Sequence, residues 1–159
     1  MGLRALITED NPDLQWIFTE AFIHVSFEVA VAKDGYEAIE YLRNTLPDVL
    51  ILDLNMPGCT GQDVLDHLRQ SGQLDRVHII VVTGNALAAR FLDPGLADLV
   101  LIKPVDPVML VNLARRLIKS CKPGKTPPET LEQTSIKEIV NESDDGVGAN
   151  QKLSTTGDT

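Results

Sequence analysis

The sequence lacks a long apolar segment, a paired cysteine motif and a cluster of basic residues, and each absence excludes a class of protein. No apolar run approaches the ~20 residues that a membrane-spanning helix needs, so we expect no contact with a membrane. The two cysteines, Cys59 and Cys121, belong to no CxxC pair and have no metal-ligand spacing, and we interpret them as free thiols. The three histidines, His24, His67 and His78, share no ligand spacing, which favours ordinary structural roles.

Basic residues are too few and too scattered for a nucleic-acid-binding surface. The formal net charge is −9; residues 1–120 carry 10 basic and 16 acidic residues, and residues 121–159 carry 4 and 7. Because a negative body repels a phosphate backbone, we expect no direct binding of nucleic acid.

The length and the apolar content are those of a globular protein with one domain of ordinary size. The chain has 159 residues, of which 43% are hydrophobic. Met1 to Thr8 run straight into a strand-like pattern without a basic leader, so we expect the protein to be cytoplasmic.

Short apolar runs alternate with longer amphipathic segments, which predicts a doubly wound α/β fold with a parallel sheet. We expect these apolar runs to be strands that are buried on both faces. They are Leu3 to Thr8, Phe27 to Ala32, Asp48 to Asp53, Val77 to Thr83 and Asp98 to Lys103.

Between these strands the spacing of apolar residues predicts five helices. The first has the best-defined start, with Asn11 as N-cap, Pro12 as first residue, and Leu14, Ile17, Phe18 and Phe22 on its packed side. The others are Asp34 to Asn44 (Ala38, Ile39 and Leu42 inward), Gly61 to Gln70 (Val64, Leu65 and Leu68), the short Asn85 to Leu92, and Asp106 to Lys119 (Leu110, Leu113, Leu117 and Ile118).

The composition changes after Ser120, where Pro, Gly, Ser, Thr and Asp become frequent. We therefore expect a folded domain over residues 1–120 and a disordered acidic tail over residues 121–159. Within that tail, Ser135 and Glu138 have the spacing of a capping box, which predicts a short helix near residues 136–142.

Polar residues stand where four of the predicted strands end. Glu9 and Asp10 follow the first strand, Asp53 ends the third, Thr83 the fourth and Lys103 the fifth. Right-handed crossovers bring the carboxyl ends of parallel strands to one edge of the sheet, where ligands bind in open α/β folds. We expect these five residues to lie close together.

Taken together, these residue types suit phosphoryl transfer with Mg²⁺. Three neighbouring carboxylates repel one another unless a cation sits among them, and carboxylate-only ligation suits Mg²⁺. Lys103 and the Thr83 hydroxyl can each contact a phosphoryl oxygen, and Asp53 can serve as nucleophile. Each residue alone has an ordinary explanation, such as acids that favour a helix N-terminus, and only their combination carries the hypothesis.

The order and spacing of these motifs resemble the receiver domain of two-component signalling, in particular the single-domain, chemotaxis-regulator-like type. The motifs are Glu9-Asp10, then Asp53-Leu54-Asn55-Met56-Pro57-Gly58, then Thr83-Gly84, then Lys103-Pro104. The resemblance spans Leu3 to Ser120 and implies a flavodoxin-like sheet of strand order 2-1-3-4-5.

The resemblance also implies a role for each site residue. Asp53 would be the phosphoacceptor, and a sensor histidine kinase or a phosphotransfer protein would donate the phosphoryl group. Asp10 would bind Mg²⁺ directly, Glu9 mainly through water and Asn55 through its backbone carbonyl. Lys103, before a cis peptide bond to Pro104, would bind the phosphoryl group, and Thr83 would move towards it. The output would be a contact with another protein, and the domain would not be a turnover enzyme.

Two features depart from the family pattern. The family usually has an aromatic switch residue three positions before the lysine, and here that position is Val100. The segment from Thr83 to Lys103 is short, and its predicted helix is weak. We expect the signal output through this face to differ from that of the family.

Three other functions fit parts of the sequence. A pseudo-receiver would keep the fold and signal without phosphorylation, as the missing aromatic residue suggests. A phosphohydrolase of the haloacid dehalogenase type would need a second Asp two residues after its nucleophile, where this chain has Asn55. A flavodoxin-like cofactor binder would need a phosphate-binding loop after the first strand, where Glu9 and Asp10 stand instead.

Overall fold

A computed structural model describes residues 2–120 and 122 of the chain. Five parallel strands form one sheet of order β2-β1-β3-β4-β5, as predicted. The strands are β1 (Leu3–Thr8), β2 (Phe27–Ala32), β3 (Val49–Leu52), β4 (His78–Thr83) and β5 (Leu99–Ile102). The helices are α1 (Pro12–His24), α2 (Gly35–Asn44), α3 (Gly61–Gln70), α4 (Ala86–Arg90) and α5 (Pro107–Lys119), with a 3-10 turn, η1, at Leu74–Arg76.

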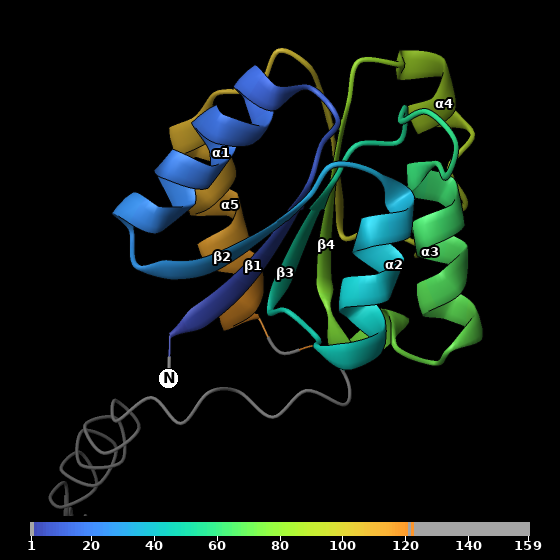
Figure 1. The fold of residues 1–159 in the computed structure, drawn as a ribbon, viewed down its shortest axis with the longest axis horizontal. Helices are drawn as coiled ribbons and strands as arrows, with labels where there is room; N and C mark the ends of the chain where they lie inside the picture. The colour runs from blue at the N-terminus through green and yellow to red at the C-terminus, as the bar shows by residue number, and fades with distance from the viewer. Residues whose placement is uncertain (1, 121, 123–159) are drawn as a thin grey trace, which may run out of the picture. The chain divides into compact units, whose positions relative to one another are not determined.

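The helices cover the two faces of the sheet and enclose a hydrophobic core on each. Figure 1 shows α1 and α5 on one face and α2, α3 and α4 on the other. β3 and β4 are buried along their whole length, because each has a strand on either side and helices on both faces. Alternate residues therefore enter opposite cores: Leu50 and Leu52 face α2 and α3, and Val49 and Ile51 face α1 and α5.

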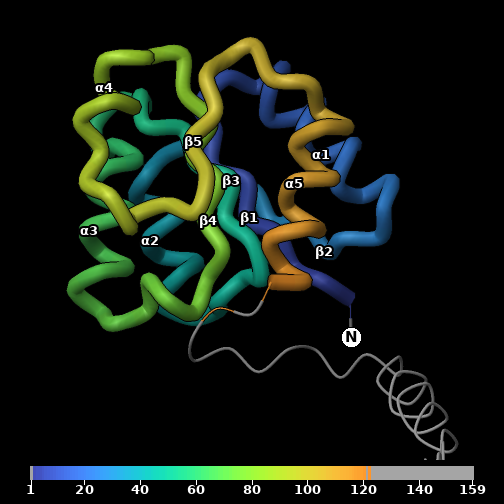
Figure 2. Tube along the Cα trace, turned by 180° about the vertical axis from the view of Figure 1, so that it is seen from behind, coloured from blue at the N-terminus to red at the C-terminus, as the bar shows by residue number. Residues whose placement is uncertain are grey.

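The prediction that all five strands are buried on both faces is wrong for β2 and β5. Val31 in β2 is 49% exposed, and Val100 and Ile102 in β5 are 40% and 45% exposed. Both strands lie at the edges of the sheet and have a neighbouring strand on one side only. Figure 2 shows β5 between α4 and α5. Since α4 has only five residues, the face of β5 that carries Val100 stays partly open.

The predicted helix starts agree with the capping contacts. The Asn11 side chain accepts hydrogen bonds from the backbone N–H groups of Asp13 and Leu14, and Pro12 is the first helical residue. Thr60 and Asp63 form a capping box at the start of α3. Several predicted helices and strands extend one or two residues beyond the observed ones, in most cases because a polar residue next to the helix or strand acts as a cap or begins a loop.

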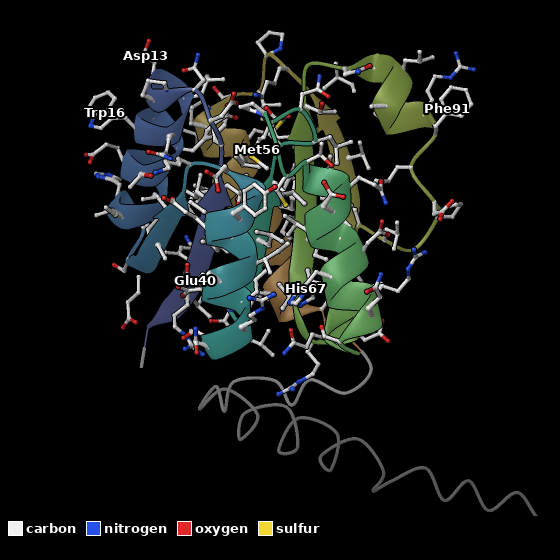
Figure 3. All side chains as sticks on the ribbon, turned by 45° about the vertical axis from the view of Figure 1, so that its right-hand side comes forward. Asp13, Trp16, Glu40, Met56, His67 and Phe91 are labelled. Atoms are coloured by element: carbon white, nitrogen blue, oxygen red, sulfur yellow. The ribbon has the colours of Figure 1, made fainter. Side chains whose placement is uncertain are left out.

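Most of the predicted packed side chains are buried. Fully or nearly buried are Phe18, Phe22, Ala38, Leu42, Val64, Leu65, Leu68, Leu110 and Ile118. Ile17 was predicted to be packed but is 38% exposed, since it lies at the margin of the buried stripe of α1. Figure 3 shows Trp16 and Phe91 projecting outward from α1 and from the end of α4.

Part of the sequence prediction lies outside the described residues. This holds for Cys121, for the capping residues Ser135 and Glu138, for the short helix near residues 136–142 and for almost all of the predicted tail. Within the described residues, Cys59 is a buried free thiol, and no helix has the length and apolar character needed to span a bilayer.

Candidate functional site

The carboxyl ends of the strands bring the predicted site residues to one edge of the sheet. Parallel register pairs Thr8 of β1 with Leu52 of β3, and Leu52 with Val81 of β4. Glu9 and Asp53, which come directly after Thr8 and Leu52, therefore stand side by side. This edge lies at the top of Figure 1.

An acidic cluster occupies this edge. Carboxylate oxygens of Glu9, Asp10 and Asp53 all lie within 4.8 Å of one another. Glu9 and Asp53 are only 2% and 4% exposed, whereas Asp10 is exposed. The backbone fixes the two buried residues, because the N–H of Glu9 donates to the carbonyl of Ala32 (3.1 Å) and that of Asp53 to the carbonyl of Thr8 (3.0 Å). The cluster is thus held rigidly on its buried side and reaches solvent at Asp10.

Lys103 bridges the two buried carboxylates. Its Nζ donates to Oε2 of Glu9 and to Oδ2 of Asp53, each at 2.8 Å. The remaining oxygens accept backbone hydrogen bonds: Oε1 of Glu9 from the N–H of Asn11 (3.1 Å) and Oδ1 of Asp53 from the N–H of Asn55 (3.0 Å). Every carboxylate oxygen of the buried pair therefore has a donor.

Burial and charge shift the protonation of this cluster. Desolvation raises the pKa of Glu9 above its ordinary value, although the hydrogen bond from Lys103 opposes the shift. Burial lowers the pKa of Lys103, but the hydrogen bonds to Asp53 and Glu9 outweigh that effect, so the net shift is upward. Lys103 therefore stays a cation through the physiological pH range.

The donor set suits a hard divalent cation. Three carboxylates beside a single ammonium group leave excess negative charge when all are ionised, and oxygen atoms of this kind are the ligands that Mg²⁺ prefers. The exposed Asp10 gives a cation access from solvent. Asn55, the predicted carbonyl ligand, lies in the exposed part of the loop after β3, next to Asp53.

Thr83 lies at the same edge, at the end of β4. It is fully buried, and its hydroxyl oxygen accepts the N–H of Asn85 at 3.1 Å, which leaves the O–H as a donor. The backbone N–H of Lys103 donates to the carbonyl of Thr83 (2.9 Å), so β4 and the lysine are directly coupled. The Lys103–Pro104 peptide bond is cis, as the resemblance implied.

Gly61 supports the site and was not among the predicted site residues. A Cβ at this first residue of α3 would lie 2.2 Å from the carbonyl oxygen of Asp53 and 2.7 Å from Cα of Leu54. The N–H of Gly61 also donates to the carbonyl of Leu54 (3.1 Å). A glycine at the start of a helix, directly after the N-cap Thr60, was the signal in the sequence.

A second charged cluster lies at the amino ends of β4 and β5, opposite the carboxyl ends that carry the acidic cluster. It was not among the predicted site residues either. Nζ of Lys122 lies 2.9 Å from Oδ2 of Asp98 and donates to the carbonyl of Val77 at 2.7 Å. The same Asp98 oxygen accepts the N–H of Ile79 (2.6 Å) and lies 4.0 Å from Nδ1 of the buried His78. No local spacing links these residues, so the sequence held no signal for this contact.

Known proteins share this combination of sequence and fold. The family described as response regulator receiver domain matches residues 5–115. The Regulator of RpoS from Escherichia coli (strain K12) is 33% identical over 122 residues, which cover 76% of this chain and 35% of that protein. The hybrid signal transduction histidine kinase D from Dictyostelium discoideum is 31% identical over 142 residues, which cover 86% of this chain and 9% of that protein. This chain thus spans only a small part of either relative.

A solved structure extends the comparison to three dimensions. The response regulator protein TrrA from Thermotoga maritima, solved in complex with Mg(2+)-BeF, matches with a TM-score of 0.65 and 26% sequence identity. The match covers 72% of this chain and 98% of that chain.

Proposed function

The chain belongs to the response regulator receiver domain family of two-component signalling, and we propose that it is a phosphorylation switch in which Asp53 accepts the phosphoryl group. Receiver domains interact with histidine kinases or phosphotransfer proteins, and a phosphohistidine on such a partner would be the donor. The observation that carries this proposal is the contact of Lys103 with the buried Asp53 inside an acidic cluster.

The proposed reaction is a transfer between two nucleophiles. An oxygen of the Asp53 carboxylate forms a bond to phosphorus while the bond from phosphorus to the donor imidazole nitrogen breaks. The electron pair of that bond stays on the imidazole, which then takes up a proton. Water later attacks phosphorus, releases inorganic phosphate and restores the carboxylate, so the domain switches slowly and is not a turnover enzyme.

Glu9, Asp10, Asp53 and the backbone carbonyl of Asn55 would hold Mg²⁺ at this edge. When bound, the ion neutralises charge that builds up on the phosphoryl oxygens. The protein would supply the positioning: the N–H of Asn55 bonds one Asp53 oxygen, and the ammonium group of Lys103, which bonds the other, would contact a phosphoryl oxygen.

Thr83 and the segment after it would transmit the change. We expect the Thr83 hydroxyl to turn from Asn85 towards the phosphoryl group and to draw the loop before α4 with it. Val100 stands where the family has its aromatic switch residue, and this residue is 40% exposed beside a short α4. The output would then be a contact with a protein partner in the cytoplasm, without direct binding of nucleic acid or membrane.

The half-exposed Val100 also favours a second candidate, a pseudo-receiver that signals without phosphate. Intact-mass spectrometry after incubation with acetyl phosphate separates the two. We expect a Mg²⁺-dependent gain of about 80 Da, one phosphoryl group, that the Asp53→Asn variant loses. If Mg²⁺ binds and no adduct forms, the pseudo-receiver is the better description.

A further inference from the structure

We propose that Glu9 is a positioning residue that holds Lys103 across the acidic cluster, so that the ammonium group competes with a divalent cation for the same carboxylates. Glu9 would thereby set the metal affinity of the resting protein. This inference rests on the proposed function, since it concerns the same site.

The hydrogen bonds of Glu9 aim it at Lys103. Its Oε1 accepts the N–H of Asn11 at 3.1 Å, which turns Oε2 towards Nζ of Lys103 at 2.8 Å. The Glu9 side chain is 3% exposed and that of Lys103 is 19% exposed, so solvent screens this pair weakly. Lys103 is thus held between two carboxylates rather than at Asp53 alone.

The same oxygens are those that a cation would need. Oxygens of Glu9, Asp10 and Asp53 lie within 4.8 Å of one another, and Lys103 contacts two of these three residues. A cation that enters the cluster must therefore weaken at least one contact of the ammonium group. The net free energy of metal binding is therefore the free energy gained by ligation less the free energy lost with those ammonium contacts.

The length of the Glu9 side chain decides whether this competition occurs. An aspartate here would keep the charge, and it could still accept the N–H of Asn11, since Asp commonly bonds the backbone N–H two residues on. It is shorter by one methylene, about 1.5 Å, and would lose its reach to Lys103. Glu9→Asp thus removes the contact with Lys103 while conserving charge.

The test measures metal binding without phosphorylation. Free Mn²⁺ is counted by electron paramagnetic resonance during titration of the full chain as wild type, Glu9→Asp, Lys103→Met and the double variant. We expect Glu9→Asp to bind Mn²⁺ about tenfold more tightly, because one charge-assisted hydrogen bond no longer competes with the ion. In the Lys103→Met background, Glu9→Asp should change the affinity by less than about twofold.

Two results would overturn the inference: an unchanged or weaker affinity in Glu9→Asp, or an equal gain in both backgrounds, which would mean that Glu9 acts independently of Lys103. Lys103→Gln provides a second route through the cycle if Lys103→Met does not fold, as judged by circular dichroism. Asp10→Asn, which should weaken binding in every background, verifies that the ion occupies this cluster. Failure of the proposed function would look different, with Mn²⁺ bound normally and no adduct formed from acetyl phosphate.

Discussion

Gly61→Ala should damage both the stability of the domain and the position of its phosphoacceptor. The added Cβ would lie 2.2 Å from the carbonyl oxygen of Asp53, where ordinary contact begins at 3.4 Å, so the shortfall is about 1.2 Å. The obstructing atoms belong to the backbone of Asp53 and Leu54 and cannot rotate away. Either the start of α3 or the Asp53 backbone must therefore move.

Two opposing effects set the size of the loss. Replacing glycine by alanine favours a helix by at most about 1 kcal/mol. Overpacking of a well-packed interior costs about 1–3 kcal/mol, and more where backbone must shift. The overpacking wins, and we expect a net loss of about 1–2 kcal/mol in the free energy of unfolding. A displacement of the carboxylate by roughly 1 Å would slow phosphorylation by about 10²-fold.

Urea unfolding measures the first effect, and the rate of adduct formation from acetyl phosphate measures the second. Gly84→Ala is the matched control for stability, since no atom lies within 4 Å of the Cβ it would receive. If Gly61→Ala unfolds at the wild-type urea concentration and is phosphorylated at the wild-type rate, the close approach of α3 to Asp53 does not hold the site in place.

Two further predictions concern the charged clusters. Lys122→Met should lower the free energy of unfolding by about 1–3 kcal/mol, because the ammonium group donates to the Val77 carbonyl and pairs with Asp98; Lys119→Met, at an exposed position, should change it by less than about 0.5 kcal/mol, and equal losses would contradict the assignment. Burial raises the pKa of Glu9, so the stabilisation linked to its proton is complete below the ordinary glutamate pKa and is lost as pH rises through the folded-state pKa. The stability of Glu9→Gln relative to wild type should therefore increase from pH 4 to pH 8 in thermal unfolding without divalent cations, and a gap that is constant with pH would refute this.

Most of the sheet could be predicted from the sequence, because each strand and helix start is recognised from a few neighbouring residues. Runs such as Val49–Leu52 can be recognised without knowing their neighbours, and Asn11 with Pro12 marks a helix start within a few residues. The strand-end residues Glu9 and Asp53 could be brought together on paper, because parallel topology leaves one edge for their side chains. Roles assigned to these residues by resemblance remain predictions.

The features that were not predicted depend on parts of the chain that are far apart in the sequence and close together in the fold. The exposure of Val100 follows from the edge position of β5 and the brevity of α4, and neither is encoded in the apolar run itself. The contact of Gly61 with Asp53 requires the path of the loop after β3. Lys122 reaches the carbonyl of Val77, 45 positions earlier in the chain, and only the folded chain brings them together.

The site buries two carboxylates beside one ammonium group, and this imbalance of charge would make it responsive to a bound cation or to a phosphoryl group. Burying Glu9 and Asp53 side by side costs desolvation free energy. The ion pairs with Lys103 offset only part of it, as the raised pKa of Glu9 indicates. A cation at the cluster or a phosphoryl group on Asp53 would change the charge around Lys103, and its ammonium group would then form different contacts. The backbone N–H of Lys103 is bonded to the carbonyl of Thr83, so a movement of the Lys103 backbone would act on the end of β4 and the start of the segment leading to α4. The charged cluster at the carboxyl ends of the strands is therefore linked through β4 to its neighbour β5, on whose partly open face Val100 lies.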